Sequence, residues 1–274
     1  MRSADRIINL TSSNFTVDQF NKRLIINGYP YKSDVQELAP RLKSLAMEKN
    51  LEKIWLWAYD SDVAEFARNG FKFEGRMHGR NDQPVVSMAY FMNPLRGISN
   101  KLQLEDDIIQ SIYNNPVEPL QPLSENYELR LLEPSDTIEI SNLLKSVFVT
   151  YPTPIDPNYI FKQMSIGCLF AGVFYKNKLI SVSAAYPDDH LLRCEMTDCA
   201  TKDEFRGQNL TERLLMLLET EILKGNDYIL YTLARARSYG VNRVFYKLGY
   251  NYQGCLINNC HIAGNWEDLN LWVK

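Results

Sequence analysis

The chain has 274 residues, enough for two domains of ordinary size, and its 45% hydrophobic and 23% charged residues are typical of proteins that pack a core. Its formal net charge of −3 argues against a nucleic-acid or anionic-membrane partner. The first residues do not resemble a signal peptide, and no run approaches the roughly 20 apolar residues that span a bilayer, so we expect a cytoplasmic protein.

The cysteines and histidines form no recognisable site. The five cysteines contain no C-x-x-C pair, and the three histidines match no zinc spacing. Without an export signal we expect reduced thiols and no metal. A Cys–His nucleophile pair stays open as an alternative, although no pair of positions is favoured.

The first 95 residues predict a small α/β unit. A helix is expected over 34–49 and an apolar strand over 54–59. The segment VAEFARNGFKFEG, starting at Val63, predicts a helix that ends at a glycine before an aromatic strand, and VVSMAYFM (85–92) predicts one more strand.

Residues 96–125 predict a connector, because prolines surround a single expected helix over 101–113. We therefore divide the chain into an N-terminal unit (1–95), this connector (96–125) and a C-terminal domain (126–274).

The C-terminal domain predicts a mixed α/β fold of order β-α-α-β-β-β-α-β-α-β-β. The expected elements are a strand over 127–132, helices ending near 148 and 165, hairpin strands over 168–175 and 179–185, a strand over 191–201, a helix over 210–224, a strand over 228–233, a helix over 238–248, and two closing strands.

The two units share a repeated pattern. VAEFARNGFKFEG aligns with NRVFYKLGYNYQG, starting at Asn242, and the flanking helix and strands recur in the same order. This favours duplication of a supersecondary unit, although helix–Gly–strand is also a common helix ending. The N-terminal copy lacks the Arg-Gly turn of the C-terminal copy, so we expect a truncated half-domain that packs or shapes a site.

The main functional pattern is EMTDCATKDEFRGQNLTERLL, residues 195–215, in which a strand, a tight turn and a helix follow one another. The first N–H groups of such a helix lack partners and its dipole is positive there, so together they hold a pyrophosphate. Gly207 lets the backbone approach the phosphates, and Arg206 adds a positive charge. A plain turn with an exposed arginine is the alternative.

This block and its order of elements resemble the acetyl-CoA-binding core of the GNAT acyltransferases. Their phosphate loop, Q/R-x-x-G-x-G/A, corresponds to residues 204–209 here. Gly207 and the adjacent Arg206 match, whereas Glu204 and Asn209 depart from the pattern. Because asparagine tolerates a left-handed backbone, we expect the loop to be preserved.

A closer resemblance covers nearly the whole C-terminal half. EMTDCAT, LYTLARARSYGVNRVFYKLGYNYQGCLINN and WEDLNLWVK are similar to the β-lysine N6-acetyltransferases, and a partial N-terminal unit also fits. The expected fold is an α/β, GNAT-type mixed central sheet flanked by helices, preceded by a smaller, truncated GNAT-like α/β unit.

The resemblance implies acetyl-CoA as the co-substrate. The strand before the loop is expected to splay from its neighbour, so that pantetheine lies along its edge and the Cys199 N–H polarises the thioester carbonyl. The residues expected to bind the cofactor are Cys199, Ala200, Thr201, Arg206, Gly207, Gln208, Asn209, Leu210, Thr211 and Ser238.

The attacking amine must lose a proton, since a lysine-type amine has a pKa near 10. The candidates are Glu195 and Asp198, which strand alternation places on opposite faces unless a bulge intervenes. By comparison with some histone-acetylating relatives we expect Glu195 as the base and Asp198 as the ammonium anchor, with the reverse open; a structural carboxylate is the alternative for each.

Many GNAT enzymes protonate the leaving thiolate with a tyrosine on the following helix. Here Phe245 occupies that position, so either a local distortion brings Tyr246 in or the thiolate leaves without a side-chain acid.

The carboxylate of an amino-acid substrate needs a cation, for which Arg235 and Arg237 are suitably placed. Asn258 and Asn259 are further candidates for substrate binding. Solvated loop arginines and ordinary turn chemistry are the alternatives.

The sequence thus predicts acetyl transfer from acetyl-CoA to the side-chain amine of a small cationic amino acid, β-lysine first. Another amine (lysine, a polyamine or an antibiotic) and a silent acyl-CoA-binding regulatory module are the rivals. A homodimer is compatible with this interpretation.

Overall fold

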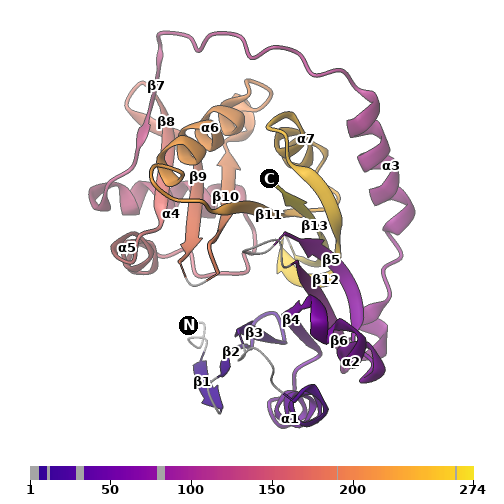
Figure 1. Cartoon of the computed structure of the whole chain (residues 1–274). Helices are drawn as coiled ribbons and strands as arrows, with labels where there is room; N and C mark the ends of the chain where they lie inside the picture. The colour runs from indigo at the N-terminus through magenta and orange to yellow at the C-terminus, as the bar shows by residue number, and fades with distance from the viewer. Residues whose placement is uncertain (1–5, 11–12, 29–33, 79–83, 190, 263) are drawn as a thin grey trace. The chain divides into compact units, whose positions relative to one another are not determined.

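The computed structural model describes residues 6–10, 13–28, 34–78, 84–189, 191–262 and 264–274, and the chain forms two compact units (Figure 1). The first comprises Met1–Leu102, Gln253–His261 and Asn265–Leu269, and the second Gln103–Tyr252, Ile262–Gly264 and Asn270–Lys274. The last two strands therefore contribute to both units. This division differs from the expected contiguous one, because the closing strands complete the sheet of the first unit.

The first unit is a sheet with two helices. Its strand order is β1-β2-β3-β4-β6-β5, followed by β12 and β13. The elements are β1 (Arg6–Leu10), β2 (Ser13–Asp18), β3 (Arg23–Gly28), α1 (Val35–Glu48), β4 (Lys53–Tyr59), α2 (Val63–Arg68), β5 (Lys72–Met77) and β6 (Val85–Phe91). From α1 onward the expected elements are confirmed to within a few residues. The three strands before α1 were not predicted.

The core of this unit lies where α1 meets the sheet. Val35, Ala39, Leu42 and Ala46 recur at helical spacing and are buried together with apolar side chains of β2, β3, β4 and β6. Alternation along the strands supplies the other half of this core.

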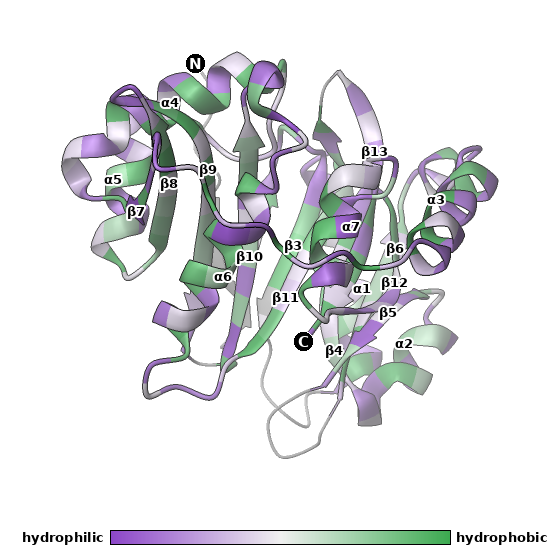
Figure 2. Ribbon diagram, turned by 90° about the horizontal axis from the view of Figure 1, so that it is seen from above, coloured by the Kyte–Doolittle hydropathy of each residue, from purple (hydrophilic) through white to green (hydrophobic). Residues whose placement is uncertain are grey.

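The second unit contains α3 (Leu102–Asn114), whose alternating polar and apolar bands are visible in Figure 2. Its strands run in the order β13-β11-β10-β9-β8-β7. The elements are β7 (Tyr127–Leu131), α4 (Thr137–Val147), α5 (Pro157–Ser165), β8 (Leu169–Tyr175), β9 (Lys178–Asp188), β10 (Arg193–Thr201), α6 (Leu210–Ile222), β11 (Ile229–Arg235), α7 (Tyr239–Lys247), β12 (Asn251–Ile262) and β13 (Asn265–Val273). The predicted α/β order is confirmed.

Alternate residues of β8 and β9 face two different cores. Ala171 and Val173 pack with α6, whereas Phe170 and Phe174 pack with α4 and α5. The helices therefore cover opposite faces of these strands (Figure 1), as in a three-layer α/β unit.

The repeat seen in the sequence extends to structure. Phe66 packs against Phe71 with ring centroids 5.1 Å apart, and Phe245 packs against Tyr250 at the same distance. The glycine before each second ring has a positive φ, 81° and 85°. The strands also follow the same neighbour order, β4-β6-β5 and β11-β13-β12, which a shared helix ending alone does not require.

In the sheet of the first unit, β5 pairs with β12 at Gly75 and Gly254. Gly254 has φ +146°, and a Cβ there would lie 2.2 Å from the carbonyl oxygen of Glu74. Only glycine fits such a close backbone approach. Among the described residues, no helix combines the length and apolar character that a bilayer crossing requires.

Candidate active site

The site is built where two parallel strands of the second unit separate. β10 and β11 pair from Arg193 and Ile229 to Glu195 and Tyr231, and no further pair follows within residues 191–262. The predicted splay of the strand before the cofactor loop is therefore confirmed.

A β-bulge changes which way the later residues of β10 face. Thr197 pairs with Ala184 on β9 but Ala200 pairs with Val182, so β10 carries one extra residue between them. Asp198 lies in this bulge with φ +52°, a left-handed conformation that is uncommon for aspartate. The bulge offsets the strand alternation. Glu195 pairs with Tyr186 on β9, and the Tyr186 hydroxyl donates to Asp198, so the two carboxylates lie on the same face of the sheet.

The loop after β10 leaves the start of α6 open. Gly207 has φ +78°, and Asn209, the residue before α6, has φ 55° and ψ 28°. No side chain caps this helix start, and its first two residues, Leu210 and Thr211, line the cavity described below. The expectation that asparagine preserves a left-handed loop at this position is confirmed.

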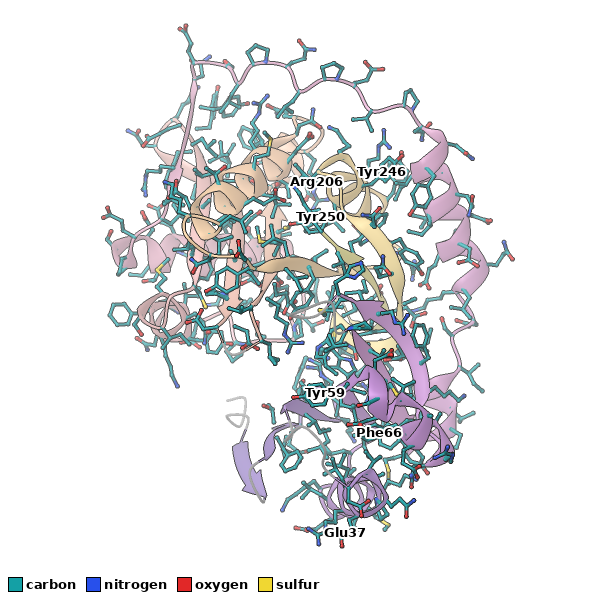
Figure 3. The ribbon with its side chains drawn as sticks, viewed as in Figure 1. Glu37, Tyr59, Phe66, Arg206, Tyr246 and Tyr250 are labelled. Atoms are coloured by element: carbon teal, nitrogen blue, oxygen red, sulfur yellow. The ribbon has the colours of Figure 1, made fainter. Side chains whose placement is uncertain are left out.

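Three of the cations near this loop line the cavity described below. Arg206, which is exposed and labelled in Figure 3, donates to the carbonyl of Thr201 (3.3 Å) and pairs with Asp203 (2.7 Å). Lys247 of α7 pairs with Glu212 and donates to the side chain of Asn209 at 3.3 Å. The third cation, the guanidinium of Arg243, donates to carbonyls at the end of α3 and beyond. Because Arg206 and Lys247 are each paired with a carboxylate, an anionic ligand here depends mainly on the start of α6.

A cavity of about 580 Å³ joins the loop to the gap between the strands, a volume common for small-molecule sites. Its walls come from the loop after α4, β10, the start of α6, β11 and α7. The expected residues that line it are Asp198, Cys199, Thr201, Arg206, Gly207, Asn209, Leu210, Thr211, Arg235 and Ser238.

Asp198 is held by two tyrosines. The Tyr151 hydroxyl donates to Oδ1 at 2.5 Å and the Tyr186 hydroxyl donates to Oδ2 at 2.7 Å. Asp198 is 6% exposed, and burial raises its pKa while the two hydrogen bonds oppose that rise. Burial and the neighbouring carboxylate raise the pKa of both tyrosines well above 10, so both hydroxyls remain donors.

Glu195 is half-buried and does not line the cavity. One of its carboxylate oxygens lies 3.5 Å from the hydroxyl of Tyr231 on β11. Burial, with Glu195 beside it, raises the pKa of that hydroxyl. Glu195 and Asp198 both raise the pKa of Tyr151, so the negative charges of the two carboxylates are both felt at its hydroxyl.

Phe245, not Tyr246, is the residue of α7 that lines the cavity. Tyr246 packs against Tyr113 of α3 at 5.1 Å and against Trp272, and Figure 3 labels it on that side of α7. Neighbouring helical residues diverge by about 100°, so a residue beside Phe245 faces elsewhere. The distortion that was one of two alternatives for Tyr246 is absent from α7, which is regular between Tyr239 and Lys247.

Of the two candidate arginines, Arg235 lines the cavity and Arg237 is exposed outside it. Buried Asn242 fixes this turn by donating to the carbonyls of Arg235 and Ser238, both at 2.8 Å, while its oxygen accepts from Trp272 at 2.7 Å.

The remaining expected residues do not line the cavity. Ala200 is buried in the core under α4, and Gln208 accepts a hydrogen bond from Tyr127 at 2.7 Å. Asn258 and Asn259 belong to the first unit, where the side chain of Asn258 donates to the carbonyls of Arg96 (3.0 Å) and Ile98 (3.1 Å). Asn258 lies within β12, so the turn chemistry given as the alternative does not describe it, and its side chain makes structural hydrogen bonds instead.

Cys199 is the cysteine that lines the cavity, and its chemistry argues against a thiolate nucleophile. Burial raises the pKa of its thiol to about 12, so it stays protonated near neutral pH. Its sulfur lies 3.5 Å from the hydroxyl of Ser183.

Tyr151 and Lys247 are among the cavity residues that were not anticipated from the sequence. Tyr151 lies in the loop after α4, where the only sequence signal is the proline-rich run YPTPIDP. The approach of Lys247 to Asn209 depends on how α6 and α7 pack.

No family model matches the sequence. The chain is 35% identical over 260 residues to N-acetyltransferase YodP of Bacillus subtilis, covering 94% of each protein. It is 32% identical over 273 residues to the β-lysine N(6)-acetyltransferase of Methanococcus maripaludis, covering 98% of each. With the β-lysine N(6)-acetyltransferase of Methanosarcina mazei it shares 36% identity over 264 residues, 87% of this chain and 97% of that protein.

Similar solved structures include RimL, a ribosomal L7/L12 alpha-N-protein acetyltransferase in complex with coenzyme A. It has a TM-score of 0.47 and 16% identity, covering 56% of this chain and 96% of that one. Another is yncA of Salmonella typhimurium with acetyl-CoA, at a TM-score of 0.48 and 12% identity, covering 55% and 94%. By its similarity to the three curated relatives over nearly their full length, the chain belongs to the GNAT N-acetyltransferases, in the family that includes YodP and the β-lysine N6-acetyltransferases.

Proposed function

We propose that this protein transfers the acetyl group of acetyl-CoA to the side-chain amine of a small cationic amino acid, with β-lysine as the preferred substrate. The observation that carries the proposal is one cavity with an uncapped helix start in one wall and a buried carboxylate in another. The names of two relatives support the choice of β-lysine.

The cofactor end of the cavity is the loop before α6. The N–H groups of Leu210 and Thr211 and the backbone at Gly207, which carries no side chain, suit a pyrophosphate, with Arg206 beside it. The pantetheine arm would lie between β10 and β11, where no strand pairing competes for backbone groups. The Cys199 N–H would then polarise the thioester carbonyl.

The amine end of the cavity is acidic. Asp198 lines it and Glu195 stands behind it on the same side, so a cationic amine is attracted there. Arg235 lines the same cavity and would pair with a substrate carboxylate, as guanidinium forks do.

The first test is release of the CoA thiol from acetyl-CoA by the purified protein with β-lysine, α-lysine or spermidine. Release with β-lysine well above the others supports the proposal. Release with another amine alone contradicts the substrate, and binding of acetyl-CoA without turnover on any amine contradicts the activity.

An arginine pair sharpens this test. Arg235→Ala should raise the KM for β-lysine about 10- to 100-fold, because a charge-assisted hydrogen bond contributes roughly 1.5 to 3 kcal/mol. It should leave the weaker turnover of spermidine unchanged, since spermidine has no carboxylate. Arg237→Ala, which alters an exposed neighbour, should change neither KM, and an equal effect of both variants would contradict the role of Arg235.

A further inference from the structure

The tyrosines that hold Asp198 differ in their access to the cavity. Tyr151 lines it together with Asp198, whereas Tyr186 does not and packs against Phe170 with ring centroids 5.9 Å apart. The two hydroxyls bond to different oxygens of the same carboxylate. One of them, that of Tyr151, can therefore contact both a bound substrate and Asp198.

We propose that Tyr151 is a catalytic residue that passes a proton from the attacking amine to Asp198. The inference rests on the proposed acetyl transfer. In this proposal Asp198 accepts the proton through Tyr151. Glu195 is then not the base and contributes only a nearby negative charge.

The proposed step conserves its protons. The hydroxyl oxygen of Tyr151 takes one proton from the substrate ammonium while the hydroxyl proton moves to Oδ1 of Asp198, leaving a neutral amine, a neutral tyrosine and a protonated Asp198. The amine nitrogen attacks the thioester carbon and the carbon–sulfur bond breaks. The second proton of the nitrogen goes to the departing thiolate sulfur, and Asp198 returns its proton to water before the next turnover.

Geometry supports a relay through this pair. The Tyr151 oxygen and Oδ1 of Asp198 lie 2.5 Å apart, within the range of charge-assisted hydroxyl–carboxylate hydrogen bonds, which are stronger than neutral ones. The bulge with φ +52° holds Asp198 in place, and a strained backbone of this kind is often kept where it serves a reaction. Tyr151 is also fixed by its ring, which packs against Phe148 at 4.6 Å.

The surroundings of Asp198 suit a proton acceptor. Burial raises its pKa above that of an exposed aspartate, although the hydrogen bonds from Tyr151 and Tyr186 oppose the rise, and a higher pKa makes a carboxylate a better proton acceptor. Among the described residues, the titratable groups that act on Asp198 and its two tyrosines include Cys168 just before β8, Tyr159 of α5, and Glu195 and Cys199 of β10, and these four are not cations.

The matched variants are Tyr151→Phe and Tyr186→Phe. Each removes one hydroxyl that bonds to Asp198 and keeps the aromatic ring, but only the first removes a hydroxyl in the cavity. With β-lysine near pH 7 we expect kcat/KM to fall at least about 100-fold in Tyr151→Phe, a common cost of losing general base catalysis, and less than about tenfold in Tyr186→Phe. Equal losses in both variants, or no loss in Tyr151→Phe, would overturn the proposal.

The pH profile separates a relay from mere support of the fold. Above pH 7 the wild-type kcat/KM should change little, whereas that of Tyr151→Phe should rise about tenfold per pH unit, because the neutral amine increases in that proportion below its pKa near 10. A deficit that stays constant from pH 7 to 9 would mean that the hydroxyl has a structural role only.

Asp198→Asn is the second variant, in case Tyr151→Phe does not fold as judged by circular dichroism and acetyl-CoA binding. It should show the same loss and the same rise with pH, and near wild-type turnover would refute the relay. If the wild type acetylates no amine, the proposed function itself has failed. If it does and these variants remain active, only the relay has failed.

Discussion

Asn209 joins the phosphate loop to α6 and departs from the family pattern, which has glycine or alanine there. Its left-handed backbone, φ 55° and ψ 28°, shows what that position requires. Asparagine adopts this conformation at little cost, whereas a β-branched residue does not. The side chain also accepts a hydrogen bond from Lys247.

Replacing this residue in two ways separates conformation from contact. Asn209→Gly and Asn209→Val both lose the bond from Lys247, but only valine opposes the positive φ, at a cost of about 1 to 2 kcal/mol. We expect the KM for acetyl-CoA to rise roughly tenfold in Asn209→Val and by less than about threefold in Asn209→Gly, in steady-state kinetics. Similar values for the two variants would show that the contact, not the backbone, sets the affinity.

Residues whose role depends on local sequence could be predicted, and those that depend on packing could not. Gly207 and Asn209 were identified because a helix that starts after a glycine is visible in the sequence. The bulge at Asp198 depends on the register of β10 against β9, which sequence alternation does not reveal. Tyr151 reaches Asp198 across 47 positions of sequence. The base and anchor assigned from resemblance are therefore reversed in our proposal, with Asp198 as acceptor.

Between elements, the first unit joins β4, β5 and β12 through one buried ion pair. Lys53 and Glu74 are bonded at 2.8 Å, with side chains 0% and 2% exposed. Lys53 also donates to the carbonyl of Ile257, and Glu74 accepts from the backbone N–H of the same residue, both at 2.9 Å. Burial lowers the pKa of Lys53 and raises that of Glu74, and each partner opposes the shift of the other.

Removing one partner of this pair should destabilise the protein strongly. Lys53→Met leaves the Glu74 carboxylate buried without its cation, so we expect a loss of about 3 to 5 kcal/mol in urea unfolding followed by tryptophan fluorescence. Combining it with Glu74→Leu should cost less than the sum of the two single changes by at least roughly 1 kcal/mol.

The control is Lys49→Met, because Lys49 pairs with Glu48 at the surface, where the side chains are 35% and 67% exposed. We expect a change within about 0.5 kcal/mol there. A loss as small as this in Lys53→Met would contradict the importance of the buried pair.

The elements themselves were predictable to different degrees. Helices and strands with clear periodicity, such as α1, α6 and β8, were located to within one or two residues. Strands β1, β2 and β3 were missed because they come before the first helix, so the sequence shows no alternation of strands and helices there. These strands are defined by their pairing with one another and with β4, which depends on tertiary structure.

For the whole molecule, contiguous boundaries at 1–95 and 126–274 do not correspond to independent structures. Residues 253–261 and 265–269 belong to the first unit, where β12 pairs with β5. A sequence-based division follows chain order, and it has no means of showing that late strands complete an early sheet.

A fragment of residues 126–274 should therefore neither remain soluble nor bind acetyl-CoA, since it exposes the edge of β12 that β5 otherwise pairs. As a control, the chain should be split near Glu118, which is exposed between α3 and β7, and the two pieces co-expressed; this cut should preserve activity. Sedimentation and acetyl-CoA binding give the readout. A soluble, cofactor-binding 126–274 fragment would show that its fold is independent after all.

Because β12 and β13 contribute to both units, the first unit cannot complete its sheet until translation of the chain is nearly finished. Residues 1–102 leave the ribosome first, but the strands that complete their sheet are among the last to be made. At about 5 to 20 residues per second, the edge of β5 waits roughly 9 to 36 s for its partner. During that time the nascent N-terminal unit presents an open strand to other chains, so its yield in the cell should depend on chaperones that shield the edge until translation ends.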